Sequence, residues 1–406
     1  MRRISLGLAS IGAALALVVQ PAWAAPSPSP TPTATEPSAS ALTPRTATIG
    51  GDRLAQPGRQ LDALPGATRL PRIYAKSWII ADATTGEVLA AKNAHLQRPP
   101  ASTLKSLTAL TLLPRLSPET TTVATDKATR VDGTRVGLIA GKTYTVNDLM
   151  YGMMLHSGND AAVALAQANG GVTKTVDEMN AVAAQLQAKD TVAKSPNGLD
   201  HPGQQSSAYD LALIARAGLQ REDFATIVST ASFDFPVTPK KSKLIVNQNR
   251  LITHHYKGAV GVKMGFTTEA GRTFVAAANR HGHTIIFVGM GIISRSDAAA
   301  KTGLDWAFAN LGKVAPVGTL VDPTSDAVVV ASPPPPTQAP VDLSTAGLDV
   351  PTPGDPMAPW WFWTVIVLGG LVVVIGWRAR QIRRNRKPPY GASPSVRVDY
   401  RPYDPR

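Results

Sequence analysis

The chain has 406 residues, contains no cysteine and carries a formal net charge of +13. Without cysteine it can form neither disulfide bonds nor thiolate metal sites, so a folded domain must be held together by its core alone. A basic excess of this size is typical of nucleic-acid-binding proteins, but the sequence has no arginine-rich stripe interleaved with aromatic residues. We therefore expect no nucleic-acid partner.

The first 24 residues have the pattern of a secretory signal peptide. Arg2 and Arg3 precede an apolar stretch, and residues 22–24 (Ala-Trp-Ala) form a small-x-small cleavage site. We expect residues 1–24 to be removed, so that the mature chain begins near Ala25. An uncleaved anchor helix is the weaker alternative, because the apolar stretch is short.

Two segments with few large apolar residues flank the central part of the chain. Residues 25–70 are rich in Pro, Ser, Thr and Ala, and residues 322–359 include a run of prolines. Such compositions cannot bury enough apolar surface to form a core, so we expect both segments to be extended linkers. Residues 71–321 remain, which is enough for one domain with a sizeable core or for two closely packed lobes.

The central part opens with a predicted hairpin. Residues 74–81 and 87–91 have strand composition and flank a turn-forming sequence at 82–86. Two prolines then precede a predicted helix whose first turn holds Ser102. One side of this helix is lined by leucines at helical spacing, namely Leu104, Leu107, Leu110 and Leu113.

Helical patterns dominate the middle of the chain and strand patterns follow them. The four predicted helices cover residues 146–155, 160–168, 176–188 and 208–217. Three strands separated by short Gly-bearing turns come next, at 260–264, 272–278 and 284–291, and a last helix covers 297–309. This order predicts an antiparallel sheet covered by helices, with a helical lobe inserted beside it.

A transmembrane helix is predicted at residues 360–377, which carry no charge and are bordered by tryptophan. Residues 378–406 begin with a cluster of Arg and Lys. By the positive-inside rule this basic tail stays in the cytoplasm, so the residues before the helix lie outside the cell. Attraction to anionic lipid headgroups accounts for the charge of the tail. A buried core helix is the alternative, which the lack of a polar face disfavours.

Ser102 and Lys105 form a Ser-x-x-Lys motif at the start of the first predicted helix. Positions i and i+3 share one face of a helix, so the Lys105 amine can reach the Ser102 hydroxyl. A serine hydroxyl is a weak nucleophile near neutral pH and needs such a base. One motif of this kind is expected by chance in roughly 400 residues, so by itself it is weak evidence.

Ser157, Gly158 and Asn159 form a second motif, in a tight loop between two predicted helices. A loop of this kind can project a hydroxyl and an amide into a cleft. Helix capping by Asn159 or Asp160 explains the same residues, and for this motif alone capping is the favoured explanation.

Lys263, Met264 and Gly265 form a third motif, on a predicted strand. A cation beside a glycine suits an anionic, peptide-like ligand, because the missing side chain lets a ligand backbone lie against the strand edge. The alternative is an exposed strand lysine before a turn glycine. For this motif alone the alternative is favoured.

Together the three motifs, in this order, resemble those of the penicillin-binding D-alanyl-D-alanine carboxypeptidases, serine peptidases of the β-lactamase and penicillin-binding-protein superfamily. The resemblance covers about residues 74–308 and includes flanking patches at 82–86, 195–199 and 247–251. It implies an α/β fold of the α+β type, with a five-stranded antiparallel sheet flanked by helices and an inserted helical lobe. It implies no metal and no cofactor.

The resemblance also implies catalytic roles. Ser102 would be the nucleophile and Lys105 its proton acceptor, kept partly neutral by burial and by a second nearby lysine. Ser157 would relay the proton to the leaving amine, and Asn159 would bind the substrate amide. The backbone N–H groups of Ser102 and Phe266 would form the oxyanion hole.

The terminal carboxylate of the substrate would be bound by Lys263 and by Arg295. The family usually has Thr or Ser at the position of Met264, and a thioether cannot donate the hydrogen bond that such a hydroxyl makes. Thr267 or Thr268 would take over part of the missing contact. The alternative to a binding role for Arg295 is that it is an ordinary surface charge near the start of a helix. We expect Met264 to weaken carboxypeptidase turnover.

The sequence therefore predicts an extracellular, membrane-anchored enzyme of a Gram-positive type envelope. It would remove the terminal D-alanine from peptidoglycan stem peptides and be acylated by β-lactam antibiotics. A D,D-transpeptidase and a β-lactamase of the same fold remain alternatives. The β-lactamase is disfavoured because such an enzyme needs a glutamate in a Glu-x-x-Leu-Asn sequence to activate water. The glutamates between Asn159 and Lys263 are Glu178 and Glu222, and neither stands in such a sequence. A weakly active or non-catalytic wall-binding or sensory homologue is the third alternative, prompted by Met264 and the linkers.

Overall fold

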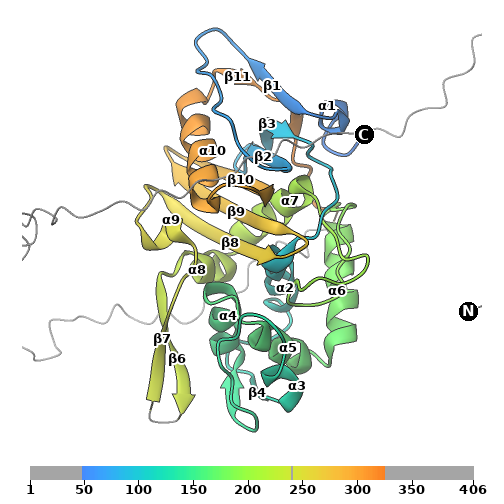
Figure 1. Ribbon diagram of the computed structural model, residues 1–406, viewed down its shortest axis with the longest axis vertical. Coiled ribbons are helices and arrows are strands. Elements are labelled where there is room, and N and C mark those ends of the chain that lie inside the picture. Colours follow the sequence, from blue (N-terminus) through green and yellow to red (C-terminus); the bar gives the residue numbers. More distant parts are fainter. Residues whose placement is uncertain (1–47, 239–240, 325–406) are drawn as a thin grey trace, which may run out of the picture. The chain divides into compact units, whose positions relative to one another are not determined.

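The computed structural model describes residues 48–238 and 241–324 (Figure 1). Its central sheet is built from β1 (Arg59–Ala63), β2 (Ser77–Asp82), β3 (Glu87–Lys92), β8 (Ala259–Thr267), β9 (Gly271–Arg280), β10 (His283–Ile292), β11 (Val314–Ala315) and β12 (Gly318–Thr319). The strand order is β11-β1-β3-β2-β10-β9-β8, with β12 paired to β3, and all of these pairs are antiparallel. The antiparallel sheet expected from the sequence is thereby confirmed.

The helices of the described residues fall into two groups by position in the chain. Between β3 and β8 lie the 3₁₀ helix η1 (Ala101–Leu104), α2 (Lys105–Leu112), α3 (Asp126–Thr129), α4 (Val146–Leu155), α5 (Asn159–Ala168), α6 (Val172–Gln185), α7 (Ala208–Leu219), α8 (Glu222–Ser229) and α9 (Arg250–Thr253). α1 (Asp52–Ala55) precedes the sheet, and α10 (Ser296–Asn310) follows β10. The predicted inserted lobe lies within the first group, and Figure 1 shows α3, α4, α5 and α8 below β8.

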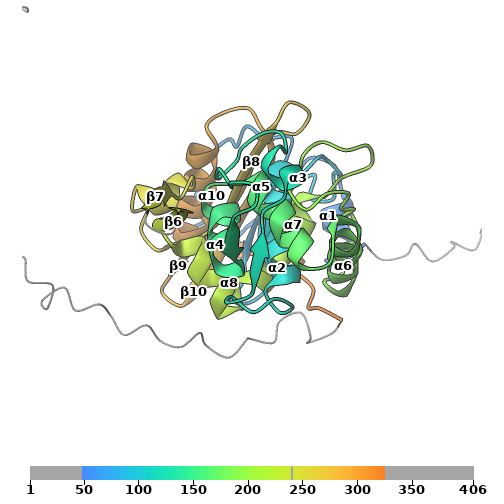
Figure 2. The same cartoon turned by 90° about the horizontal axis from the view of Figure 1, so that it is seen from below.

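The middle strands of the sheet are buried on both faces because helices pack on each side. Along β2, Ile79 and Ala81 belong to the core shared with α2 and α7, whereas Trp78 and Ile80 belong to the core shared with α10. This alternation is the two-residue period of a strand. Figures 1 and 2 show the sheet between α10 and the helices of the lobe.

The start of the predicted domain at residue 71 is wrong. Leu54 in α1 and Leu70 are almost fully buried, and β1 pairs with β3 through Leu61 opposite Ala90. Residues 48–70 therefore belong to the folded unit and not to a linker. Their few apolar residues are diluted by Pro, Gly and polar neighbours, which is why the composition of residues 25–70 concealed them.

The expected count of five strands is also too low. The five predicted strands correspond to β2, β3, β8, β9 and β10. The sheet continues beyond β3 with three further strands, β1, β11 and β12. β11 and β12 have two residues each. Strands this short carry no alternation pattern, so only their partners define them.

Three smaller features were not expected. β4 (Thr121–Val123) pairs with β5 (Thr143–Thr145), and α6 begins at Val172 rather than at residue 176. A second hairpin joins β6 (Ser232–Thr238) to β7 (Lys241–Val246) and packs on α4, where Phe233 stacks on Tyr151 with ring centroids 4.3 Å apart.

The predicted signal peptide at 1–24 and the predicted membrane helix and basic tail at 360–377 and 378–406 lie outside the described residues. So do most of the two predicted linkers. Within residues 48–238 and 241–324, no helix has the length and apolar character needed to cross a membrane.

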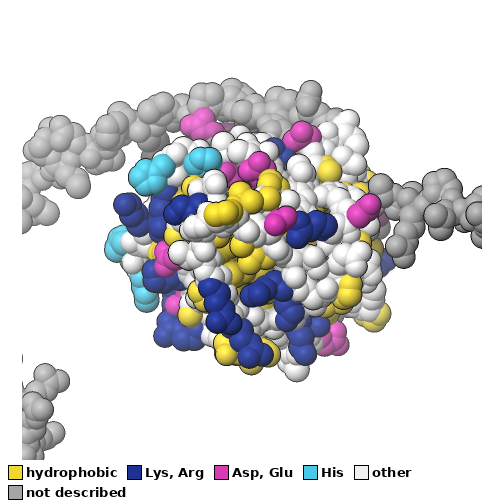
Figure 3. Space-filling model, turned by 90° about the horizontal axis from the view of Figure 1, so that it is seen from above, with side chains coloured by type: hydrophobic (Ala, Val, Ile, Leu, Met, Phe, Trp, Pro, Cys, Tyr) yellow, Lys and Arg dark blue, Asp and Glu magenta, His cyan; other side chains and the backbone are white. Residues whose placement is uncertain are grey.

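Figure 3 shows that Lys and Arg side chains gather along one side of the upper face of the domain, whereas acidic side chains are scattered.

Candidate active site

Ser102 lies in η1, the short 3₁₀ turn that leads into α2. Two threonine hydroxyls hold this turn by donating to the carbonyl oxygen of Pro100: Thr103 at 2.6 Å and Thr273 of β9 at 3.0 Å. β8 runs so close to the turn that a Cβ on Gly265 would lie 2.6 Å from the backbone nitrogen of Ser102. Only glycine permits this approach.

Lys105 is fully buried one turn after Ser102, and its amine lies at the centre of the site. Nζ is 2.9 Å from Ser102 Oγ, 2.7 Å from Asn159 Oδ1 and 2.6 Å from the carbonyl oxygen of Asn197. A neutral amine has two N–H groups and one lone pair. With the two carbonyl oxygens accepting the N–H groups, the lone pair faces the Ser102 hydroxyl.

The surroundings favour the neutral form of Lys105. Burial and the positive charge of Lys263 lower the pKa of Lys105 well below its ordinary value, against the opposing effect of the Asp160 carboxylate. Lys263 is itself buried, which lowers its pKa to about 7, and its Nζ donates to the carbonyl oxygen of Met264 at 3.0 Å. Two lysines in one buried site disfavour each other's charge.

Ser157 lies in the loop between α4 and α5, and Asn159 is the first residue of α5. Ser157 has a positive φ of 63°, an uncommon conformation for a residue other than glycine, and only 4% of its surface is exposed. Asn159 donates its Nδ2 to the carbonyl oxygen of Asp132 at 2.6 Å, which turns Oδ1 toward Lys105. The structure thus brings Ser102, Lys105 and Asn159 together, and Ser157 lies two residues before Asn159 in the chain.

Asp160 has a part in the site that the sequence did not reveal. Capping of the following helix was expected, and the Asp160 carboxylate does accept the N–H of Ala161 in the first turn of α5 at 3.0 Å, although the N-cap residue itself is Gly158. The same buried carboxylate also accepts hydrogen bonds from the backbone N–H groups of Val136 at 2.9 Å, Gly137 at 2.8 Å and Leu138 at 3.0 Å. It therefore holds a loop that lies more than 20 positions earlier in the chain, a pairing without any local sequence signal.

We expect Asp160→Ala to lower the free energy of unfolding by about 3 kcal/mol, because backbone donors at Val136 and Leu138 would be buried without an acceptor. Urea denaturation would measure the loss. Asp126→Ala is the control, since its ion pair with Arg130 is exposed and should be worth less than about 1 kcal/mol. Equal losses in the two variants would contradict this assignment.

Lys263 and Gly265 face Ser102, whereas Met264 faces the other side of β8. Met264 lies opposite Phe274 in the β8–β9 pair and packs in the core shared with α10. With Arg295 and Phe274 it lines a cavity of about 300 Å³, whose other charged residues are Arg250, Arg272 and Asp297. The strand alternation that separates Lys263 from Met264 could be expected from the sequence, but the cavity could not.

Arg295 immediately precedes α10 and forms an ion pair with Asp297, with 2.6 Å between Nη2 and Oδ2. It is largely exposed. Arg250 and Arg272 at the same cavity form no ion pair among the described residues. The structure therefore places Arg295 beside Met264, together with two further guanidinium groups that the sequence had not singled out.

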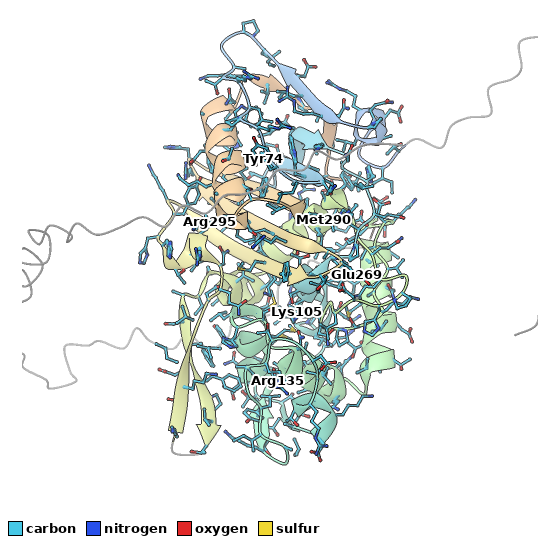
Figure 4. All side chains as sticks on the ribbon, viewed as in Figure 1. Tyr74, Lys105, Arg135, Glu269, Met290 and Arg295 are labelled. Atoms are coloured by element: carbon cyan, nitrogen blue, oxygen red, sulfur yellow. The ribbon has the colours of Figure 1, made fainter. Side chains whose placement is uncertain are left out.

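Phe266 and Thr267 continue β8 past the glycine. Phe266 has 65% of its surface exposed, and the guanidinium of Arg272 lies over its ring. The Thr267 hydroxyl donates to Asp200 Oδ1 at 2.7 Å, so it is already engaged within the protein. Figure 4 shows Lys105 between β8 and the helical lobe, with Arg295 toward one end of β8 and Glu269 beyond the other.

No group of His, Cys, Asp or Glu side chains within the described ranges could hold a metal ion. The site residues are hydroxyls, amines and amides together with backbone groups. This donor set suits acyl transfer by an activated serine.

Comparisons with known proteins agree with this geometry. Residues 65–294 match the model of the family Peptidase_S11, described as D-alanyl-D-alanine carboxypeptidase. The D-alanyl-D-alanine carboxypeptidase DacB2 of Mycobacterium tuberculosis is 41% identical over 262 residues, which cover 63% of this chain and 89% of that protein.

Two solved structures extend the comparison to the fold. A D-alanyl-D-alanine carboxypeptidase from Mycobacterium tuberculosis shares 39% sequence identity with a TM-score of 0.60, covering 63% of this chain and 99% of that one. The DD-transpeptidase of Streptomyces K15 shares 28% identity with a TM-score of 0.57, covering 60% of this chain and 100% of that one. The expected transpeptidase-like fold is confirmed.

Proposed function

Because the chain belongs to the Peptidase_S11 family of D-alanyl-D-alanine carboxypeptidases, we propose that it releases the terminal D-alanine of peptidoglycan pentapeptides through an acyl-enzyme on Ser102. One observation carries the proposal: the buried Lys105 amine lies 2.9 Å from Ser102 Oγ while two carbonyl oxygens accept its N–H groups. A base in this position activates a serine hydroxyl.

In the acylation step, Ser102 Oγ attacks the carbonyl carbon between the two D-alanines and its proton passes to Lys105 Nζ. The negative charge that develops on the carbonyl oxygen is stabilised by the backbone N–H groups of Ser102 and Phe266. Ser157 then relays the proton to the leaving D-alanine amine as the C–N bond breaks. Attack by water on the resulting ester releases the shortened peptide and restores Ser102.

Lys263 and Arg295 would bind the terminal carboxylate of the substrate. Met264 cannot donate a hydrogen bond to it, and the Met264 side chain points into the cavity lined by Arg250, Arg272 and Arg295. These guanidinium groups line the cavity on the face of β8 that is turned away from Ser102, so Lys263 is the cation that faces the reacting serine. Restoring the hydroxyl with Met264→Thr should raise kcat/KM for a pentapeptide; an unchanged value would contradict the idea that Met264 limits turnover.

Penicillin would also acylate Ser102: Oγ attacks the β-lactam carbonyl in the same oxyanion hole, and the C–N bond of the ring breaks, leaving the opened penicillin as an ester on the serine. A β-lactamase would release the opened penicillin quickly, whereas we expect slow release from Ser102. A D,D-transpeptidase differs only in the acceptor, because an amine replaces water. The similarity to the Streptomyces K15 DD-transpeptidase keeps this second activity open for the same site.

Labelling with a fluorescent penicillin, combined with measurement of D-alanine released from a pentapeptide, tests the proposed function. We expect Ser102→Ala to abolish both. Ser106→Ala is the matched control, since Ser106 follows Lys105 directly in the sequence but is buried without a hydrogen-bond partner in the described residues. Equal labelling of wild type and Ser102→Ala would contradict the assignment, and an unlabelled wild type would favour a non-catalytic wall-binding or sensory protein.

The pH dependence of acylation tests the electrostatics of the site. Only neutral Lys105 can accept the proton, so the rate rises with pH through the pKa of Lys105. Lys263→Met removes a positive charge that lowers this pKa. The Lys105 pKa therefore rises and the ascending limb of the pH–rate profile should move to higher pH. A limb that stays in place or moves to lower pH would contradict the coupling of the two lysines.

We also propose that the enzyme acts outside the cell and is anchored by residues 360–377. The support comes from the sequence: a signal-peptide pattern at 1–24, an uncharged apolar run at 360–377 and a basic tail after it. Such a protein should remain with the membrane fraction in high salt and be released by detergent. Release by salt alone would overturn the anchor.

A further inference from the structure

The loop over residues 191–206, between α6 and α7, supplies one of the hydrogen-bond acceptors of Lys105. The carbonyl oxygen of Asn197 lies 2.6 Å from Lys105 Nζ, and that of Pro196 accepts the Thr108 hydroxyl of α2 at 2.7 Å. Two consecutive carbonyl groups of the loop therefore pack against α2. A contact that fixes the ends of this loop also fixes the acceptor of the lysine.

The two ends of the loop are joined to each other and to α7. Val192 and Gln205 exchange two backbone hydrogen bonds, at 2.9 and 3.1 Å. The Thr191 hydroxyl lies 2.9 Å from Ser206 Oγ and 2.7 Å from Oδ2 of Asp210, which is in the first turn of α7. The side chains of Thr191, Ser206 and Asp210 are buried. Asp210 thus attaches the closed end of the loop to the helix.

The Asp210 carboxyl has no basic partner to compensate a charge. Only 1% of the residue is exposed, and it forms no ion pair with a Lys, Arg or His of residues 48–238 and 241–324. The titratable groups around it are Asp190 just before the loop, His95 after β3 and Tyr209 of α7. His95 is itself bound to Asp190, with 2.7 Å between Nδ1 and Oδ2.

These surroundings favour the uncharged acid. An ionised carboxylate that is buried without a cation is costly, and a second carboxylate beside it adds repulsion. Burial and then Asp190 raise the pKa of Asp210 to about 7, against the opposing effects of the hydrogen bonds from Thr191 and the Asp190 backbone and of His95. Asp210 therefore changes its charge near neutral pH.

We propose that Asp210 is a positioning residue of the Ser102–Lys105 pair: its uncharged carboxyl holds the end of the 191–206 loop on α7 and thereby keeps the Asn197 carbonyl oxygen on Lys105. This rests on the proposed function and adds a regulation by pH to it. As a carboxylate, Asp210 places an unpaired charge in the core beside Asp190. Separation of the loop end from α7 lets water reach this charge, so ionisation should loosen the loop and slow the acylation of Ser102.

The rate constant for acylation by a fluorescent penicillin, measured with the purified full-length chain from about pH 5.5 to 8.5, tests the proposal. Asp210→Asn keeps the size and the hydrogen-bonding groups of the uncharged acid but cannot ionise. Lys105 and Lys263 are common to both proteins, so the ratio of the variant rate to the wild-type rate isolates Asp210. We expect a ratio near one at low pH that rises to about ten at pH 8, because the uncharged fraction falls about tenfold per pH unit above the pKa.

Two further variants separate positioning from a general loss of packing. Asp210→Ala removes the hydrogen bonds as well as the charge, so it should acylate about tenfold more slowly than Asp210→Asn throughout the pH range. Asp82→Asn is the matched control. Asp82 is an equally buried aspartate, but its carboxylate binds the N–H of Thr84 and the ring of His283, at the turn between β2 and β3. Its rate ratio to wild type should not change with pH.

Thermal unfolding gives a readout that does not depend on catalysis. The raised pKa means that the folded protein keeps the Asp210 proton up to about pH 7, whereas the unfolded chain loses it at lower pH. The stability contributed by this group is therefore present at low pH and is lost as the pH rises through about 7. The Tm of Asp210→Asn minus that of wild type should increase over the same range.

The outcomes distinguish this proposal from the proposed function. A rate ratio that stays constant with pH overturns the positioning role, whether or not the Tm difference grows, and leaves the carboxypeptidase assignment intact. A Tm difference that does not grow with pH overturns the titration of Asp210 and with it the regulation. Failure of the wild type to be acylated at any pH overturns the proposed function and, with it, the positioning role that depends on it.

Discussion

Replacing Lys105 by methionine should lower the rate constant for acylation by penicillin at least about a thousandfold. The substitution keeps an unbranched side chain only one atom shorter but removes the base 2.9 Å from Ser102 Oγ. General-base catalysis is worth about 10² to 10⁴ in rate, and in this site it also generates the nucleophile. Stopped-flow or gel-based labelling with a fluorescent penicillin would measure the rate.

Lys127→Met is the control for this experiment, because Lys127 is an exposed residue of α3. It should acylate at the wild-type rate. Far-UV circular dichroism would show whether the Lys105 variant is folded, since the oxygens of Asn159 and Asn197 lose their donor in it. A folded Lys105→Met protein that acylates within tenfold of wild type would overturn the role of Lys105 as the base.

The second large effect is expected from Gly265→Ala. The added Cβ would lie 2.6 Å from the Ser102 backbone nitrogen and 2.7 Å from Thr273 Oγ1, closer than real Cβ atoms come to other atoms. β8 and η1 would have to separate. Because Ser102 N–H is a proposed oxyanion donor, the acylation rate should fall about a hundredfold or more, the loss typical of one such donor.

Gly289→Ala, in β10 of the same sheet, is the matched control. Its Cβ would lie 3.0 to 3.1 Å from the side chains of Ile292 and Phe287, which can shift. We expect a small loss of stability and an unchanged acylation rate. If both alanine variants acylate at the wild-type rate, the close approach of β8 to Ser102 does not matter for catalysis.

Local patterns predicted the regular elements well. The structure has α4 at Val146–Leu155, with the same bounds as the predicted helix, and the three predicted strands appear as the longer β8, β9 and β10. Each contains enough residues for its period to be visible in the sequence. The β6–β7 hairpin was missed because Pro236 and the polar residues of β7 interrupt the alternation that marks a strand.

The candidate site was predicted in its motifs but not in its supporting contacts. Ser102 and Lys105 are one helical turn apart, so their proximity follows from local geometry. The carbonyl oxygen of Asn197 and the loop held by Asp160 reach the site from distant parts of the chain. The side of β8 on which Met264 lies likewise depends on which face of the sheet meets η1 and which meets α10.

By itself the sequence determined the order of the helices and strands, the three motifs and the family that they indicate, because each is a pattern within a few residues. Only the tertiary structure decided which backbone atoms surround Lys105, that residues 48–70 complete the sheet, and that Asp200 lies beside Thr267. These are contacts between residues far apart in the chain. Their energies come from burial and hydrogen bonding in the folded state, which no local pattern records.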